Sequence, residues 1–179
     1  MLSQWLDEID AARVHETLDE VKGRLDRRED PLAKYGIRAK ELAKMLYSLI
    51  QSQTQDQPTT HIAWTPQFEP FIKEFRYFES DHLITGSHAI GPDGEFTEGF
   101  WLANSGFIVL LALLYDDPKK IARLVEIIDN AKDRLKGVEL RESVELPLTV
   151  IDAFFQRYKQ RGQGLKSEER GSSLYIPKP

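Results

Sequence analysis

The side chains best suited to chemistry lie between residues 79 and 98, where histidines and carboxylates gather around turn-forming residues. Imidazole nitrogens and carboxylate oxygens suit zinc, manganese or iron, and a turn could bring them together. The candidate metal ligands are Glu79, Asp81, His82 and His88, with Glu95 and Glu98 across the turn. Their spacing matches no recognised ligand pattern, and a turn role for Asp81 and a strand position for His88 are the simpler alternatives. We therefore predict no metal and no cofactor, and keep a small metal-dependent enzyme using loop 79–98 as the alternative function.

Motifs for other reactions do not occur in the sequence. The chain has no cysteine, which excludes disulfides, thiol nucleophiles and Cys-based zinc sites. It contains no GxSxG, no P-loop and no GxGxxG. Ser87 and His88, the nearest serine–histidine arrangement, are neighbours that would point to opposite sides of a strand. These observations favour a non-catalytic protein.

The net charge of −5 is distributed unevenly along the chain. Residues 58–99 hold seven acids and two bases, whereas the last 24 residues hold two acids and six bases. An acidic body disfavours binding to nucleic acid, which depends on neutralising phosphates, and two glutamates interrupt the basic tail. An acidic surface suits a basic partner protein, or serves only to keep the protein soluble. The binding residues predicted on this surface are Asp81, Asp93, Glu95 and Glu98.

One strongly apolar stretch, residues 100–115, must lie at the centre of the fold. It includes nine consecutive apolar residues from Phe107 to Tyr115, and a helix that is apolar on all sides must be wrapped by other elements. The stretch is shorter than the roughly 20 residues that a membrane span needs, so we expect no membrane association. The N-terminus is acidic within seven residues, unlike a signal or transit peptide, and the expected location is cytoplasmic.

The elements before this stretch are predicted from hydrophobic periodicity and turn signals. Residues 2–28 and 32–52 each show a helical period and together resemble an antiparallel helical hairpin. In residues 66–78 the aromatic side chains recur at the spacing of one helical face, which indicates core packing. The turn signal Gly91-Pro92-Asp93-Gly94 predicts either a small β-hairpin near 83–97 or an ordered loop that turns there.

Two further helices are predicted after the central one. The first begins at Asp117, a capping residue followed by Pro118, and ends at Gly137, a usual helix stop. Residues 138–146 alternate enough to form an extended connection or a short strand. The final helix is expected from about 147 to about 161.

The last segment, residues 162–179, is rich in glycine, serine and charged residues. It cannot bury enough apolar surface to offset the entropy of ordering, so we predict a flexible C-terminal tail. The apolar residues Leu174, Tyr175 and Ile176 near its end form either a docking peptide or an end without a role.

Together these patterns predict a mainly α fold in a single domain, residues 1–161, followed by the tail. About five helices surround the buried central helix at about 100–115, with the hairpin near 83–97 as a small β element. The leading function is a non-catalytic protein–protein interaction module whose partner is another protein. That module is either a subunit of a larger assembly or an inhibitor or immunity-type partner of a basic protein.

Overall fold

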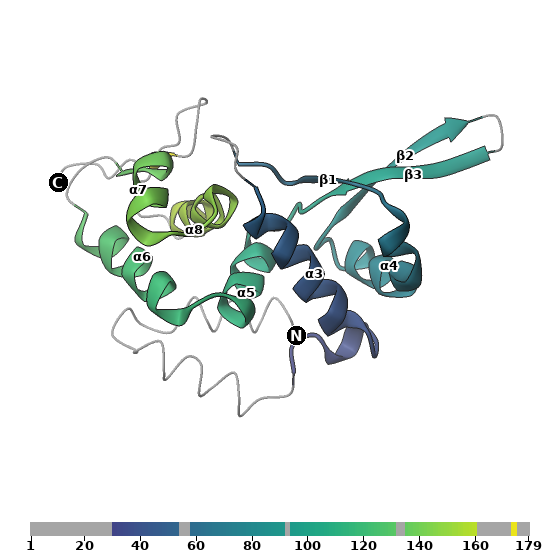
Figure 1. Ribbon diagram of the computed structural model, residues 1–179, viewed down its shortest axis with the longest axis horizontal. Helices are drawn as coiled ribbons and strands as arrows, with labels where there is room; N and C mark the ends of the chain where they lie inside the picture. The colour runs from purple at the N-terminus through teal and green to yellow at the C-terminus, as the bar shows by residue number, and fades with distance from the viewer. Residues whose placement is uncertain (1–29, 54–57, 92–93, 132–134, 161–172, 175–179) are drawn as a thin grey trace.

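A computed structural model describes residues 30–53, 58–91, 94–131, 135–160 and 173–174. This part of the chain is mainly helical with a small antiparallel sheet, which confirms the predicted fold class (Figure 1). The predicted helix 2–28 lies outside the described residues, so its pairing with 32–52 as a helical hairpin stays a prediction. Within the described residues, no helix is both long and apolar enough to cross a bilayer.

The central helix α5 (Ser105–Tyr115) lies between α3 (Ala39–Gln51) and α8 (Leu148–Gln160) in Figure 1 and packs against both. Its residues from Gly106 to Ala112 are all buried, as an all-apolar helix requires. The prediction that this helix begins at residue 100 is wrong. Asn104 caps it, because its side-chain oxygen accepts a hydrogen bond from the Phe107 N–H at 3.2 Å.

The residues just before α5 belong to a three-stranded sheet with the order β1-β3-β2. Strands β2 (Thr85–Gly91) and β3 (Gly94–Trp101) form the predicted hairpin, which projects away from the helical body (Figure 1). Strand β1 (His61–Ala63) pairs with the other edge of β3. The hairpin register shifts between Ser87 and His88, where Glu98 forms a bulge in β3.

An aromatic core joins this sheet to the helices below it. The predicted helix 66–78 is divided into the 3₁₀ helix η2 (Pro66–Phe71) and α4 (Ile72–Ser80), because Pro70 has no N–H to continue an α-helical ladder. The aromatic stripe is buried, as expected, but the aliphatic Ile72 is exposed. The buried rings of η2, α4 and β3 contact one another at centroid distances from 4.8 to 5.4 Å, and they belong to Phe68, Phe75 and Phe100.

Helix α3 begins at Ala39, seven residues after the predicted start at Leu32. A 3₁₀ turn, η1 (Ala33–Tyr35), comes first and is followed by Gly36 with φ of 115°. Only glycine adopts this conformation readily, so it interrupts the helix. The site is also crowded, because a Cβ on Gly36 would lie 2.8 Å from Oε1 of Glu74 on α4.

After α5, Asp117 caps α6 (Pro118–Asn130) as predicted, and its Oδ1 accepts a hydrogen bond from the Lys119 N–H at 2.9 Å. The role assigned to Gly137 is wrong, because it begins a helix instead of ending one. Helix α7 (Gly137–Val144) replaces the predicted extended segment, and it buries Leu140 and Val144, one helical turn apart, on the side that packs against α8.

The final helix α8 confirms the prediction for about 147–161. Of the predicted tail, the structure describes only β5 (Ser173–Leu174), which pairs antiparallel with β4 (Leu135–Lys136). Leu174 is therefore a ladder partner of Leu135, whereas Tyr175 and Ile176 lie outside the described residues.

Candidate protein-binding surface

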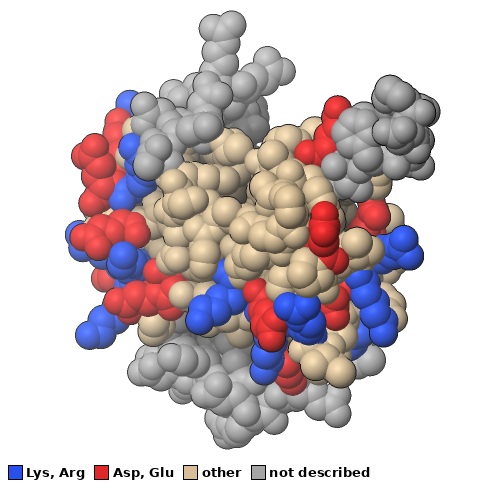
Figure 2. Space-filling model, turned by 45° about the vertical axis from the view of Figure 1, so that its right-hand side comes forward, with Lys and Arg blue, Asp and Glu red and all other residues tan. Residues whose placement is uncertain are grey.

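The charged side chains of the described residues are not spread evenly over the surface. Figure 2 shows uncharged side chains gathered over the middle of one face, with basic and acidic residues mixed along its left and lower margins. In the sequence, no lysine or arginine occurs between Arg76 and Lys119, a stretch that contains the whole hairpin. Any lysine or arginine beside the predicted acidic binding residues must therefore come from other parts of the chain.

Asp81 has such a neighbour. It lies just after α4, where Nζ of Lys34 is 2.5 Å from its Oδ2 and the Tyr35 hydroxyl donates to the same oxygen at 2.9 Å. The hydrogen bond from Lys34 holds the pKa of Asp81 below its usual value, although partial burial opposes this effect. The positive charge of Lys34 therefore balances the charge of Asp81. The contacts of Asp81 with Lys34 and Tyr35 also join η1 to the end of α4.

The other predicted acidic residues belong to the hairpin. Glu98 is exposed at the bulge of β3, and its carbonyl accepts a hydrogen bond from the Trp64 N–H at 2.9 Å. Glu95 is the ladder partner of Ile90 in the projecting part of the hairpin, and Asp93 lies outside the described residues. Asp81 therefore follows α4, whereas Glu95 and Glu98 belong to β3.

The candidate metal ligands fall into separate local roles. Oε1 of Glu79 accepts the Gly86 N–H at 3.0 Å and lies 3.8 Å from Nε2 of His88, so it ties α4 to the base of β2. His82 has φ of 55°, and the Leu83 N–H bonds back to the Phe78 carbonyl, an arrangement that ends α4. Among the described residues, no three histidine or carboxylate side chains are grouped to hold a metal ion.

A hydrogen bond between the buried Tyr47 and a half-buried aspartate joins distant elements, a feature that sequence reasoning missed. The Tyr47 hydroxyl on α3 donates to Asp116, which follows α5, and Gln51 donates to the same carboxylate at 3.5 Å. Burial raises the pKa of Tyr47, and the hydrogen bond and negative charge of Asp116 raise it further. The hydroxyl therefore stays protonated and serves as a structural donor.

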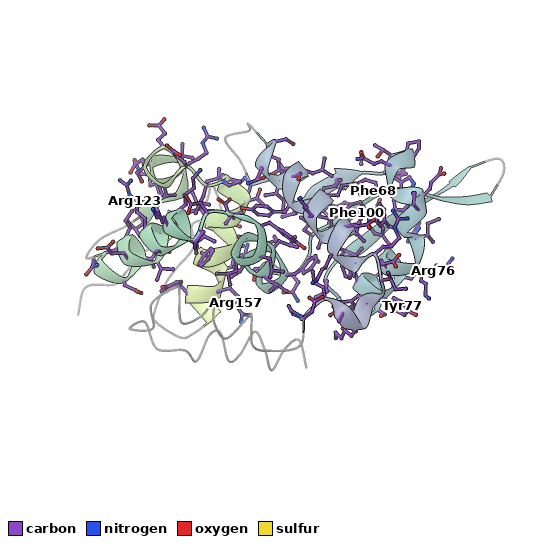
Figure 3. All side chains as sticks on the ribbon, turned by 60° about the horizontal axis from the view of Figure 1, so that its bottom comes forward. Phe68, Arg76, Tyr77, Phe100, Arg123 and Arg157 are labelled. Carbon is purple, nitrogen blue, oxygen red and sulfur yellow. The ribbon has the colours of Figure 1, made fainter. Side chains whose placement is uncertain are left out.

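The two sides of the sheet differ in character. The side toward α4 is packed, and Figure 3 shows Phe68 and Phe100 together in this region, with Arg76 and Tyr77 farther out. The opposite side is open: the Trp101 side chain is 41% exposed, and its ring centroid lies 4.8 Å from that of His61. Sequence reasoning missed this surface because it placed Trp101 in the central helix.

Gly99 allows His61 to lie close over this open side of the sheet. A Cβ on Gly99 would lie 2.6 Å from the Ile62 carbonyl oxygen and 2.8 Å from Nε2 of His61. Only a residue without a side chain permits both contacts, so glycine is needed here for close approach. The open side therefore carries a histidine–tryptophan pair beside the projecting hairpin.

Comparison with models of known protein families, with curated proteins and with solved structures finds no match.

Proposed function

We propose that the protein is a non-catalytic protein–protein interaction module that contacts a basic partner through the acidic hairpin of β2 and β3. The observation that carries this proposal is the projection of the hairpin from the helical body (Figure 1), together with the lack of lysine and arginine in its stretch of the sequence. A projecting element exposes its residues on more than one side, so a partner can reach it without any rearrangement of the core.

The physical basis is electrostatic steering. Exposed carboxylates that lack a basic neighbour create a negative potential that raises the encounter rate with a positively charged surface. Glu98 meets this condition best, because it is exposed and no lysine or arginine occurs between Arg76 and Lys119 in the sequence. Asp81 contributes less, because Lys34 matches its charge within the fold. The proposed contact therefore centres on β3, which also includes Glu95.

Both forms of the proposal, a subunit of a larger assembly and an inhibitor or immunity-type partner, use this same contact. The metal-dependent alternative gains no support from the described residues. Glu79 and His88 lie 3.8 Å apart, whereas Asp81 and His82 are held in other local roles. We therefore propose no second function.

Placing a photo-cross-linking residue at Glu98 should capture a basic protein in cells of the native host. The matched control is the same residue at Arg123, which is exposed on α6 at the opposite end of the molecule from the hairpin (Figure 3). We expect a specific cross-linked band at position 98 and none at position 123, followed by identification of the partner by mass spectrometry.

The captured partner must then bind the purified protein, and Glu98→Lys must weaken that binding more than Arg123→Glu does. The proposal would be overturned if position 98 gave no specific product. It would also be overturned if the two charge reversals had equal effects on the dissociation constant.

A further inference from the structure

Trp101, the last residue of β3, is an exposed aromatic side chain that packs against a neighbouring ring of the sheet. The ring centroids of Trp101 and His61 lie 4.8 Å apart, with an interplanar angle of 53°. The His61 ring in turn lies over Gly99, where a Cβ would be 2.8 Å from its Nε2. These contacts restrict the indole before any ligand arrives, which lowers the entropic cost of binding to it.

The chemistry of this end of β3 is suited to a cation. The π face of tryptophan attracts cations more strongly than that of tyrosine or phenylalanine. The exposed Glu98 precedes Trp101 by three residues, which corresponds to about 10 Å along a strand. No lysine or arginine occurs between Arg76 and Lys119 in the sequence. The cation–π contacts found among the described residues involve other aromatic rings, and none involves Trp101.

We propose that an arginine of the basic partner stacks on the Trp101 ring, while a second basic residue of the partner pairs with Glu98. This inference rests on the proposed function, because it extends the same contact along β3 from the bulge to the end of the strand. Charge complementarity identifies the occupant. The carboxylate and the π face of the indole both attract positive charge, whereas the carboxylate repels an acidic or phosphate-bearing ligand.

Arginine fits the Trp101 ring better than lysine does. Its guanidinium group is planar and weakly hydrated, so it stacks on an aromatic ring at a lower cost of desolvation than the compact, strongly hydrated ammonium group of lysine. Glu98, by contrast, pairs with either cation. Trp101 therefore makes the contact selective for arginine, and Glu98 adds attraction without that selectivity.

The test is an NMR titration of the full chain at low ionic strength with two short probe peptides of equal length, one of alternating glycine and arginine and one of alternating glycine and lysine. The indole N–H signal of Trp101, assigned by its loss in Trp101→Leu, should move when the arginine peptide is added. The wild type should bind the arginine peptide at least about threefold more tightly than the lysine peptide. Trp101→Leu should remove this preference, whereas Trp101→Tyr, which keeps an aromatic face, should retain part of it.

The variant Glu98→Gln separates this inference from the proposed function. It should weaken the binding of both peptides by a similar factor, because the lost charge attracts either cation. Equal affinity of the wild type for the two peptides, or an arginine preference that survives in Trp101→Leu, would overturn the stacking on Trp101, even where the loss in Glu98→Gln supported the acidic contact. If neither peptide moved the Trp101 signal and Glu98→Gln changed nothing, both proposals would be wrong.

Discussion

Replacing Leu110 with aspartate should unfold the protein. Leu110 lies in the middle of α5 and is completely buried, with α3 and α8 packed against the helix. A carboxylate at this position would lose its hydration without gaining a partner, at a cost of several kcal/mol. That cost is comparable with the whole stability of an ordinary domain, about 5–15 kcal/mol. Circular dichroism during thermal or urea unfolding should show no cooperative folded state at 25 °C.

The matched control is Leu110→Met, which keeps the apolar character and nearly the same volume. Such exchanges usually cost less than about 1.5 kcal/mol, so this variant should melt cooperatively a few degrees below the wild type. If Leu110→Asp melted cooperatively near the wild-type temperature, α5 could not be the buried centre of the fold.

Replacing Phe100 with alanine should be the next most damaging of these changes. The Phe100 ring is buried between the sheet and α4, with centroids 4.8 Å from Phe75 and 5.3 Å from Phe68. Truncating a buried phenylalanine typically costs about 3–5 kcal/mol, because the lost transfer energy adds to the cost of the cavity. Urea denaturation should show this loss in the free energy of unfolding.

The adjacent residue provides the control. Trp101 faces the open side of the sheet and is partly exposed, so Trp101→Ala should cost only about 1 kcal/mol or less. Equal destabilisation by the two substitutions would mean that the sheet does not have one packed and one open side as described.

Features encoded by neighbouring residues were predictable from the sequence. The Asp117-Pro118 pair marked the start of α6, and Gly91 and Gly94, at the ends of the predicted turn, pair where the hairpin closes. The aromatic period at 66–78 correctly indicated buried rings, because spacing along one helical face is a local property. These signals place most helices and the hairpin without any knowledge of tertiary contacts.

Features that depend on distant residues or on ambiguous ones were not predictable. Phe100 and Trp101 continue into β3, but the apolar run hides the change from strand to helix at Asn104. Gly137 can follow a helix or begin one, and the burial of α7 decides the outcome. The ion pair between Asp81 and Lys34 joins residues that are 47 positions apart in the sequence. Counting charges within one stretch of sequence therefore overestimated the negative charge around Asp81.

The association rate constant of the purified pair, measured by stopped flow as a function of salt, tests the proposed electrostatic contact most directly. Raising ionic strength from about 0.05 to about 0.5 M shortens the Debye length from roughly 14 to roughly 4 Å. Association should then slow by about an order of magnitude while dissociation changes less, and Glu95→Lys with Glu98→Lys should reproduce that slowing at low salt. An association rate that is indifferent both to salt and to these reversals would contradict binding through the acidic hairpin.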